Sequence, residues 1–163
     1  MLIRPIELGD IPGFRDVLDA VARERRFLLT LEAPPLERVE AFVSNNIERG
    51  YAQYVAVEGE RIVGWADFIP YTKESLAHVS QLGMGVLKEI RGRGLGEQLL
   101  SSVTEAAIAR GCLRLELEVF ANNLAAISLY RKHGFEYEGT KRKARRLGDE
   151  FFDIDVMARL VPK

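Results

Sequence analysis

The sequence predicts an α/β protein in which helices cover both faces of a mixed sheet, within a single domain spanning residues 1–163. Segments where hydrophobic and polar residues alternate, as in strands, take turns with segments where hydrophobic residues recur at helical spacing. One glycine-rich turn joins a strand to a helix, and a strand–helix–strand unit of this kind is parallel and right-handed. The other strands can pair in antiparallel fashion, so a mixed sheet is expected.

The first half of the chain is expected to hold a strand, two helices and three further strands. Residues 2–7 form the first strand, and Asp10 can cap the helix that follows. Pro34 and Pro35 break the chain before a second helix, which Gly50 ends. The tight turn at Glu58-Gly59-Glu60 joins two strands, and a third follows; these strands are expected at residues 51–57, 61–71 and 76–87.

The second half alternates helices with strands. The helix after the glycine-rich turn carries leucine, valine and alanine on one face and ends before Gly111. Residues 113–119 alternate leucine or valine with charged residues, as in a strand with one buried face. A helix from Asn123 to His133 is stopped by Gly134, and two strands complete the order β-α-α-β-β-β-α-β-α-β-β.

The composition excludes several classes of protein. With 163 residues, 47% hydrophobic and 29% charged, the chain is an ordinary globular protein with room for a core. Its net charge of −1 does not favour binding of nucleic acid or of a membrane surface, so any polyanion site must be local. Cys112 is the only cysteine, which excludes an internal disulfide and a cysteine-based metal cluster. We expect no metal, no signal peptide, no membrane span and a cytoplasmic location.

The most informative segment is the glycine-rich turn, which follows a hydrophobic strand and opens a helix. Its glycines at 92, 94 and 96 carry no Cβ, so backbone N–H groups can approach a ligand closely. The first helical turn adds unsatisfied N–H groups and a partial positive charge, to which Arg91 and Arg93 add full charges. The segment therefore predicts a site for the phosphate or pyrophosphate of a cofactor. Its spacing fits neither a P-loop nor a Rossmann fingerprint, and incidental glycines at a helix start are the alternative.

Two motifs carry a family resemblance. The first is Arg91-Gly92-Arg93-Gly94-Leu95-Gly96, between the fourth strand and the third helix. The second begins at Asn123 and continues as A-I-S-L-Y-R-K-H-G-F from Ala126 to Phe135. In this order and spacing they resemble the GCN5-related N-acetyltransferase (GNAT) superfamily over essentially the full chain. The segment from Leu117 to Arg159 looks most like bacterial enzymes that acetylate phosphinothricin and amino acids.

The resemblance implies a fold and a reaction. The expected GNAT fold has a central, mostly antiparallel sheet of about seven strands, with a splayed parallel pair at the cofactor cleft. The expected activity is direct transfer of an acetyl group from acetyl-CoA to a primary amine in a ternary complex, with CoA as product. Gly83 and Gly85 would permit a bulge that separates the parallel strands, although ordinary strand irregularity is the alternative.

The resemblance also implies the residues that contact the cofactor. Pyrophosphate is expected on the glycine-rich turn, and pantetheine in the gap between the fourth and fifth strands, where unpaired strand groups can bind its amides. Asn123 matches a position that bonds the cofactor arm, and it can serve as a helix N-cap at the same time. The expected cofactor-binding residues are Met84, Val86, Arg91, Gly92, Arg93, Gly94, Leu95, Gly96, Asn123 and Tyr130.

Tyr130 matches the family tyrosine that protonates the departing CoA thiolate. A phenol with a pKa of about 10 is a weak acid at neutral pH, but a thiolate forming beside it is a good proton acceptor. The alternative for Tyr130 is a core aromatic on a helix. Without the second motif, that alternative would be the better interpretation.

The general base is harder to assign, because Gln81 stands where many relatives have a strand Glu and an amide cannot act as a base. His78, earlier on the same strand, has an intrinsic pKa suited to the task. Glu32 lies in the loop between the first two helices, where relatives shape the acceptor pocket, and Glu118 lies beside the cofactor cleft. Each has a structural or solvent-facing role as its alternative, and deprotonation through ordered water needs no residue at all.

The acceptor is expected to be a small primary amine, such as an amino acid or an amino-acid-like antimetabolite. The alternatives are a protein N-terminus, as in relatives that acetylate ribosomal proteins, and a CoA-binding module without turnover. A peptide needs an open groove and a small amine an enclosed pocket, so the conformation of Phe27–Pro35 should distinguish them. The basic run Lys141–Arg146 is a solvated hairpin or attracts the CoA 3′-phosphate or an acidic acceptor. A homodimer is common among relatives, and no nucleic-acid or membrane partner is expected.

Overall fold

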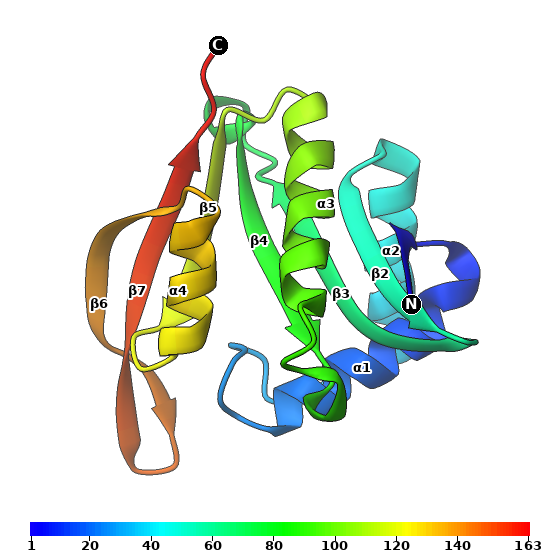
Figure 1. The fold of residues 1–163 in the computed structure, drawn as a ribbon, viewed down its shortest axis with the longest axis horizontal. Helices are drawn as coiled ribbons and strands as arrows, with labels where there is room; N and C mark the ends of the chain where they lie inside the picture. Colours follow the sequence, from blue (N-terminus) through cyan, green and yellow to red (C-terminus); the bar gives the residue numbers. More distant parts are fainter.

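The computed structural model describes all residues from 1 to 163, and it contains seven strands and four α-helices (Figure 1). The strands are β1 (Leu2–Pro5), β2 (Ala52–Glu58), β3 (Arg61–Pro70), β4 (Val79–Val86), β5 (Arg114–Phe120), β6 (Glu136–Leu147) and β7 (Glu150–Leu160). The helices are α1 (Ile11–Arg23), α2 (Leu36–Arg49), α3 (Leu95–Ala109) and α4 (Leu124–Lys132). The element order predicted from the sequence is confirmed.

All seven strands belong to one sheet, in the order β1-β2-β3-β4-β5-β7-β6. Every neighbouring pair is antiparallel except β4 and β5, which are parallel and joined through α3. Helices α1 and α2 lie on one face of the sheet, and α3 and α4 lie on the other (Figure 1). The prediction of a mixed, mostly antiparallel sheet with helices on both faces is confirmed.

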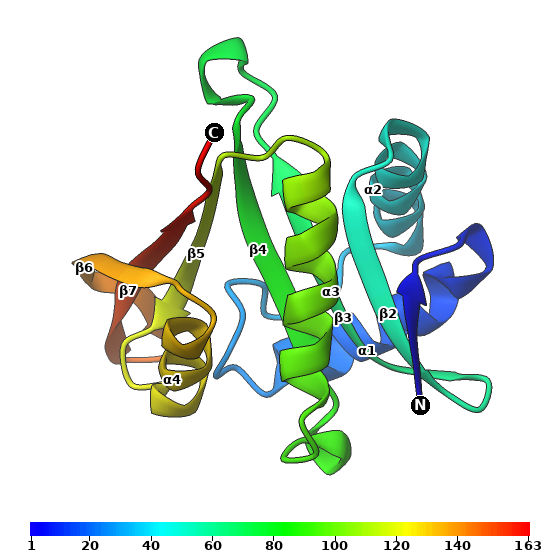
Figure 2. The same ribbon diagram turned by 45° about the horizontal axis from the view of Figure 1, so that its top comes forward.

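The parallel pair separates along its length. Strands β4 and β5 pair only from Val79 to Gln81 and from Arg114 to Glu116, and beyond these residues they diverge (Figure 2). From Leu82 to Val86, the edge of β4 that faces β5 therefore has no strand partner. The expected splay is confirmed, and it leaves backbone groups free to bind a ligand.

The expected bulge at Gly83 and Gly85 is wrong. The register between β3 and β4 runs unbroken from Pro70 opposite Ser80 to Gly64 opposite Val86. The two glycines instead make room for large or charged side chains on β3. A Cβ at Gly83 would lie 2.9 Å from Asp67 Oδ1, and a Cβ at Gly85 would lie 2.5 Å from the Trp65 ring.

Local sequence features mark the start of α4 and the ends of three helices. Asn123 caps α4, because its side-chain oxygen accepts a hydrogen bond from the Ala126 N–H at 3.2 Å. Three glycines with positive φ follow helices as predicted: Gly50, Gly111 and Gly134.

Asp10 departs from its expected role as the cap of α1. Residues Leu8–Asp10 form a 3₁₀ turn, and Asp10 accepts a 2.8 Å hydrogen bond from the Glu7 N–H. Its carboxylate also makes a bidentate pair with Arg4, at 2.6 and 2.9 Å. The helix therefore starts without a side-chain cap, because a better ionic partner holds the carboxylate.

The third long strand is shorter than predicted. Residues Glu74–Leu76 form a 3₁₀ turn, so β4 begins at Val79 and not at Leu76. The Cys112 thiol is buried beside this end of β4, and it donates to the Arg114 carbonyl at 3.2 Å. A small core role for Cys112 agrees with this packing.

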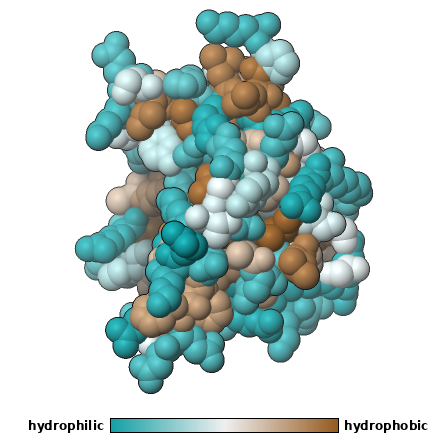
Figure 3. Space-filling model, turned by 90° about the vertical axis from the view of Figure 1, so that its left-hand side faces the viewer, coloured by the Kyte–Doolittle hydropathy of each residue, from teal (hydrophilic) through white to brown (hydrophobic).

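The basic run Lys141–Arg146 lies on the β6 side of the β6–β7 hairpin, where three of its cations have an acidic partner, among them Arg146, which lies 3.5 Å from Asp149. Lys141 and Arg145 both bind Glu118 on β5. The molecular face on this side is mostly hydrophilic, with separate hydrophobic patches (Figure 3). The attraction of this run for an anion stays a prediction. None of the helices combines the length and hydrophobicity needed to span a lipid bilayer.

Candidate active site

A cavity of about 380 Å³ lies beside the splayed strands, bounded by α1, α2, the loop between them and the facing strands. Most of its wall is hydrophobic, with large contributions from Phe14, Leu18, Phe42, Trp65, Leu117 and Phe120. Few polar side chains line the cavity, and they include Arg38, Asp67, Gln81, Glu118 and Tyr130. A mainly hydrophobic cavity of this size with few polar groups is typical of a site for a small molecule.

The segment Phe27–Pro35 forms one wall of the cavity, as expected for the acceptor side. Residues 27–30 and Pro34 line the cavity directly. The end of the segment is anchored to α1, since the Ala33 N–H donates to Asp19 at 2.9 Å and Arg15 Nε donates to the Pro34 carbonyl at 2.9 Å. Hydrogen bonds thus hold the end of this wall against α1.

The glycine-rich turn presents unpaired donors. Gly92 and Gly94 have φ angles of 78° and 77°, a conformation that glycine adopts readily and other residues do not. A Cβ at either position would meet no protein atom within 4 Å, so the space over the turn is open. The backbone N–H groups from Gly92 to Glu97 donate no hydrogen bond within the protein. Orphan donors at the start of a helix fit a pyrophosphate group.

The two arginines of the turn have different surroundings. Arg91 forms a bidentate pair with Glu24, with N–O distances of 2.8 and 2.5 Å, and its guanidinium lies 4.6 Å from the centre of the Phe27 ring. Its Nε also donates to the Val86 carbonyl at 2.9 Å. Arg93 is exposed, and its single contact is with the Glu89 carbonyl at 3.4 Å. Glu24 therefore compensates the charge of Arg91, whereas that of Arg93 is free.

Tyr130 reaches the cavity from α4, on the other side of the splayed strands from α1. Its ring packs edge-on against Phe135 at 6.0 Å, and only 8% of the residue is exposed. The hydroxyl makes no hydrogen bond within the protein, although the residue lines the cavity. Burial raises the pKa of Tyr130 to about 12, so the hydroxyl keeps its proton at neutral pH. Met84 lines the same cavity, and Val86 ends the unpaired part of β4.

Asp67, which the sequence analysis missed, is a buried carboxyl in the cavity. It lies on β3 and is only 6% exposed. Burial raises its pKa to about 8, and the backbone N–H of Gly83 acts in the opposite direction. The signal in the sequence is a single carboxylate within the hydrophobic run Ile62–Ile69. Such a residue is rarely buried without a reason.

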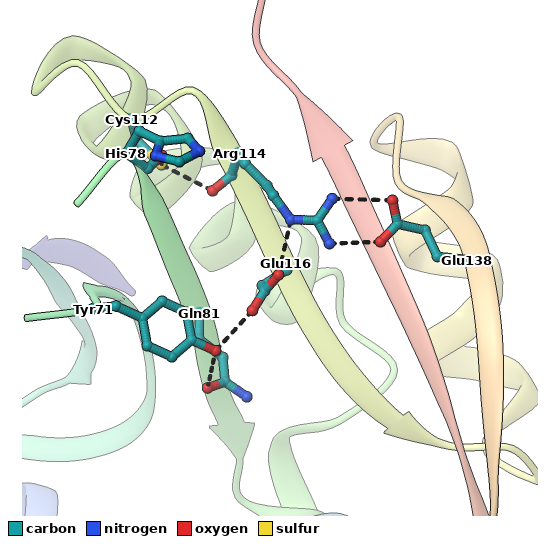
Figure 4. Close-up of polar contacts among 7 residues, drawn as sticks. All are labelled: Tyr71, His78, Gln81, Cys112, Arg114, Glu116 and Glu138. Atoms are coloured by element: carbon teal, nitrogen blue, oxygen red, sulfur yellow. Dashed lines mark hydrogen bonds and ion pairs between the residues drawn. The ribbon is translucent and has the colours of Figure 1, made fainter. Parts of the chain in front are cut away.

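Gln81 sits in a polar network where the parallel strands begin to separate (Figure 4). The Tyr71 hydroxyl donates to Glu116 at 2.7 Å and lies 3.2 Å from Gln81 Oε1. Glu116 in turn accepts from Arg114 Nε at 2.9 Å, and Arg114 also pairs with Glu138. Burial, followed by the nearby Glu116, raises the pKa of Tyr71 to about 12. Gln81 is therefore held in place by a network that already contains a carboxylate.

The structure does not bring the other candidate bases to an open position in the cavity. His78 is exposed in the turn before β4, beside Cys112 and away from Tyr71 (Figure 4). Glu32 faces solvent, with 69% of its side chain exposed and a 3.3 Å contact to Arg23. Glu118 does line the cavity, but Lys141 and Arg145 hold both of its carboxylate oxygens.

Comparison with known proteins identifies the class to which this fold and site belong. The model of the acetyltransferase (GNAT) family matches residues 17–135. The L-amino acid N-acetyltransferase AaaT of Escherichia coli is 32% identical over 114 residues, which cover 68% of this chain and 69% of that protein. The chain belongs to the GNAT acetyltransferase family.

Solved structures agree with this assignment. The ribosomal-protein-alanine N-acetyltransferase from Brucella melitensis superposes with a TM-score of 0.92 at 26% identity, covering 99% of this chain and 100% of that chain. The phosphinothricin acetyltransferase from Sinorhizobium meliloti in complex with acetyl-CoA gives a TM-score of 0.92 at 18% identity, covering 98% and 88%. The protein is an N-acetyltransferase that uses acetyl-CoA.

Proposed function

We propose that this protein acetylates the amino group of a free amino acid, or of a close analogue, that carries a hydrophobic side chain. The observation that carries this proposal is the cavity of about 380 Å³, whose wall is mostly hydrophobic and whose covering segment is anchored to α1. A pocket of this kind suits one small molecule better than an extended peptide. The activity of the Escherichia coli relative on L-amino acids supports the same acceptor class.

Arg38 supplies a reason for the acceptor to carry a carboxylate. It lines the cavity from α2, and no side-chain hydrogen bond or ion pair within the protein engages its guanidinium. A guanidinium fork pairs well with a carboxylate, and such charge-assisted hydrogen bonds are stronger than neutral ones. We assign Arg38 to the carboxylate of the amino-acid acceptor.

The chain's own residues account for binding of the donor. Acetyl-CoA supplies an acetyl group that is activated as a thioester. The free N–H groups from Gly92 to Glu97 bind the pyrophosphate, with Arg93 adding charge. The unpaired edge of β4, from Leu82 to Val86, hydrogen-bonds the pantetheine amides, and Asn123 supports the same arm.

Tyr130 assists departure of the sulfur. Its hydroxyl is free of protein partners and keeps its proton, because burial raises its pKa to about 12. It can therefore donate a hydrogen bond to the sulfur as negative charge develops there, and then pass on the proton. The surrounding hydrophobic wall excludes water, which strengthens this hydrogen bond.

A protein N-terminus is the second candidate acceptor, because the Brucella melitensis structure is of a ribosomal-protein-alanine N-acetyltransferase. In this chain the segment Phe27–Pro35 lies along the cavity, and its end is hydrogen-bonded to α1. A peptide would have to displace that wall, whereas a free amino acid would not. The location expected for the reaction is the cytoplasm, where the free thiol of Cys112 stays reduced.

The test is thiol release from acetyl-CoA with a panel of free amino acids, amino-acid amides, polyamines, aminoglycosides and short peptides. The proposal expects turnover with methionine, phenylalanine or leucine, a higher KM for the amides of the same amino acids, and no turnover with peptides. Turnover confined to peptides would establish the second candidate. If no compound in the panel gave thiol release while acetyl-CoA still bound by calorimetry, the proposed acceptor class would be overturned.

A further inference from the structure

We infer that Asp67 is the general base that removes a proton from the acceptor's ammonium group. This inference rests on the proposed function and adds a catalytic residue to it. Asp67 lies on β3, directly across the ladder from Gly83, and its carboxyl lines the cavity. Among the cavity's charged groups, it is the carboxyl that no cation engages, since Lys141 and Arg145 hold Glu118.

The glycine opposite Asp67 makes the arrangement possible. A Cβ at Gly83 would lie 2.9 Å from Asp67 Oδ1 and 3.5 Å from its Cγ, so any larger residue would displace the carboxyl. Gly83 is thus a steric requirement for Asp67 to occupy the floor of the cavity. A chain that needed only a filled core here would place a methyl group at Gly83 and a hydrophobic side chain at Asp67.

Asp67 also lies close to Gln81, which has no basic group. Ile69 is opposite Gln81 and Asp67 is opposite Gly83, so Asp67 and Gln81 are diagonal neighbours on the same face of the sheet. Glu116 is the register partner of Gln81 on β5 and already places a negative charge beside it. A carboxylate at position 81 would be repelled by the carboxylate of Glu116 on β5. Asp67 places a carboxyl group near the same point from β3, on the opposite side of β4.

The groups facing Asp67 leave its carboxyl free to take up a proton. Helix α1 presents Phe14 and Leu18, which carry no charge, and α2 presents Arg38. The facing groups on the far side are Glu118 from β5 and Tyr130 from α4. Burial raises the pKa of Asp67 to about 8, which brings its proton affinity nearer to that of an amine than an ordinary Asp would allow.

The protons and electrons of the proposed step balance. Asp67 takes one proton from the ammonium, and the freed lone pair of the nitrogen forms the bond to the acetyl carbonyl carbon. The C–S bond breaks, and the sulfur keeps its electron pair and receives the proton of Tyr130. The nitrogen loses its second proton as the amide forms, which restores Tyr130. Asp67 then releases its proton to solvent, so an ammonium and a thioester give an amide, a thiol and one proton.

The experiment compares D67N with the wild-type protein over a range of pH, using the best acceptor found in the panel. Asparagine keeps the shape of Asp67 but cannot accept the proton. We expect kcat/KM near pH 8, where the wild-type carboxyl ionises, to fall about a hundredfold or more, with the Kd for acetyl-CoA unchanged. The deficit should grow as pH rises toward 8, where the wild-type carboxyl ionises, and shrink at higher pH, because the free amine that accumulates there needs no base. It should also be smaller for an acceptor amine of lower basicity.

Controls separate this role from a structural one. D16N replaces an exposed carboxylate on α1 outside the cavity and should keep the wild-type pH profile. A deficit in D67N that is equal at every pH would show a structural role for Asp67 and overturn the inference. The inference would also be overturned if kcat/KM lost its pH dependence in E118Q but kept it in D67N.

Failure of this inference can be told from failure of the proposed function. If no amine in the panel gives turnover, the proposed function fails, and titration of labelled Asp carboxyls by carbon-13 NMR still tests Asp67. Its signal should titrate near pH 8 and shift when methionine is added to the acetyl-CoA complex. A signal that titrates in the ordinary Asp range and ignores methionine would overturn the inference by itself.

Discussion

Trp65 and Gly85 face each other across the β3–β4 ladder, and a Cβ at Gly85 would lie 2.5 Å from two atoms of the indole ring. The indole packs edge-on against Phe14 of α1 at 5.7 Å, and the same hypothetical Cβ would also approach Val21 at 3.3 Å. The absent side chain at Gly85 thus leaves room for the largest aromatic residue of the chain between the sheet and α1.

G85A should therefore destabilise the fold. The added methyl group forces Trp65 or α1 to shift, and overpacking of this kind costs about 1–3 kcal/mol. Urea unfolding followed by tryptophan fluorescence measures the change. G139A is the matched control, because Gly139 is also in a strand but has no atom within 4 Å of an added Cβ. Equal stability of the two variants would show that the Trp65 site tolerates the methyl group.

G94A should weaken acetyl-CoA binding more than it weakens the fold. The left-handed conformation at Gly94 costs about 1 kcal/mol for alanine, and the new methyl group also enters the space left for the pyrophosphate. We expect the Kd for acetyl-CoA to rise at least tenfold by calorimetry. G59A carries similar backbone strain in the β2–β3 turn and should keep the wild-type Kd. An unchanged Kd in G94A would contradict the cofactor assignment.

Y130F should lower kcat with little effect on the Kd for acetyl-CoA. The phenyl ring retains the packing against Phe135, but the donor to the sulfur is lost. We expect kcat to fall about 10- to 100-fold, measured by thiol release. Y137F removes an exposed hydroxyl, 2.8 Å from Thr140, and serves as the control. A large loss of acetyl-CoA affinity in Y130F, with kcat preserved, would argue against the acid role.

D67N should stabilise the protein at neutral pH. The folded state raises the pKa of Asp67 from its ordinary value of 3.8 to about 8, so between these values the folded protein holds a proton that the unfolded chain releases. The favourable contribution of Asp67 to the free energy of unfolding is complete below pH 3.8, and it is lost as pH rises to 8. Each pKa unit is worth about 1.4 kcal/mol. The wild-type protein should therefore be less stable to unfolding than D67N by several kcal/mol at pH 8.

Thermal unfolding of D67N and wild type from pH 4 to pH 8 tests whether the stability advantage of D67N grows with pH. The melting temperatures should converge toward pH 4 and separate toward pH 8, with D67N higher. A constant difference across this range would mean that the carboxyl does not change its proton affinity on folding.

R38M should raise the KM for an amino acid and leave the KM for its amide unchanged. Methionine keeps much of the hydrophobic stem of Arg38 but cannot pair with a carboxylate. The expected increase is about tenfold or more, in line with loss of a charge-assisted hydrogen bond. An equal rise for both acceptors would indicate lost packing at the cavity margin. Initial rates at saturating acetyl-CoA provide the comparison.

Local signals in the sequence predicted the order of the elements. Gly50, Gly111 and Gly134 follow helices because a left-handed residue there lets the chain turn away, and Asn123 caps α4 through its own side chain. These features depend on neighbours only a few residues away. The splay of β4 and β5 was predicted from the two family motifs and not from periodicity.

Features that depend on distant partners escaped prediction. The pairing of Arg91 with Glu24 joins residues far apart in the sequence, so nothing near the glycine-rich turn shows that its charge is compensated. Asp10 was assigned to a helix cap because its pairing with Arg4 depends on how β1 meets the first turn. Asp67 is a lone carboxylate in a hydrophobic strand, and its sequence neighbours do not show that Gly83 on β4 leaves room for it. Gly83 and Gly85 suggested a bulge, because the sequence alone does not show their cross-strand partners.

The guanidinium of Arg91 contacts both halves of the site: it follows β4 at the cofactor turn, and it covers the ring of Phe27 in the acceptor wall. Glu24, at the end of α1, fixes it between them. Donor and acceptor therefore do not meet independent surfaces. If one of them tightens the packing of Phe27 on Arg91, it raises the affinity for the other, and thermodynamic reciprocity requires the same factor in both directions. Arg91 would then couple the binding of the two substrates, so that each binds more tightly when the other is present.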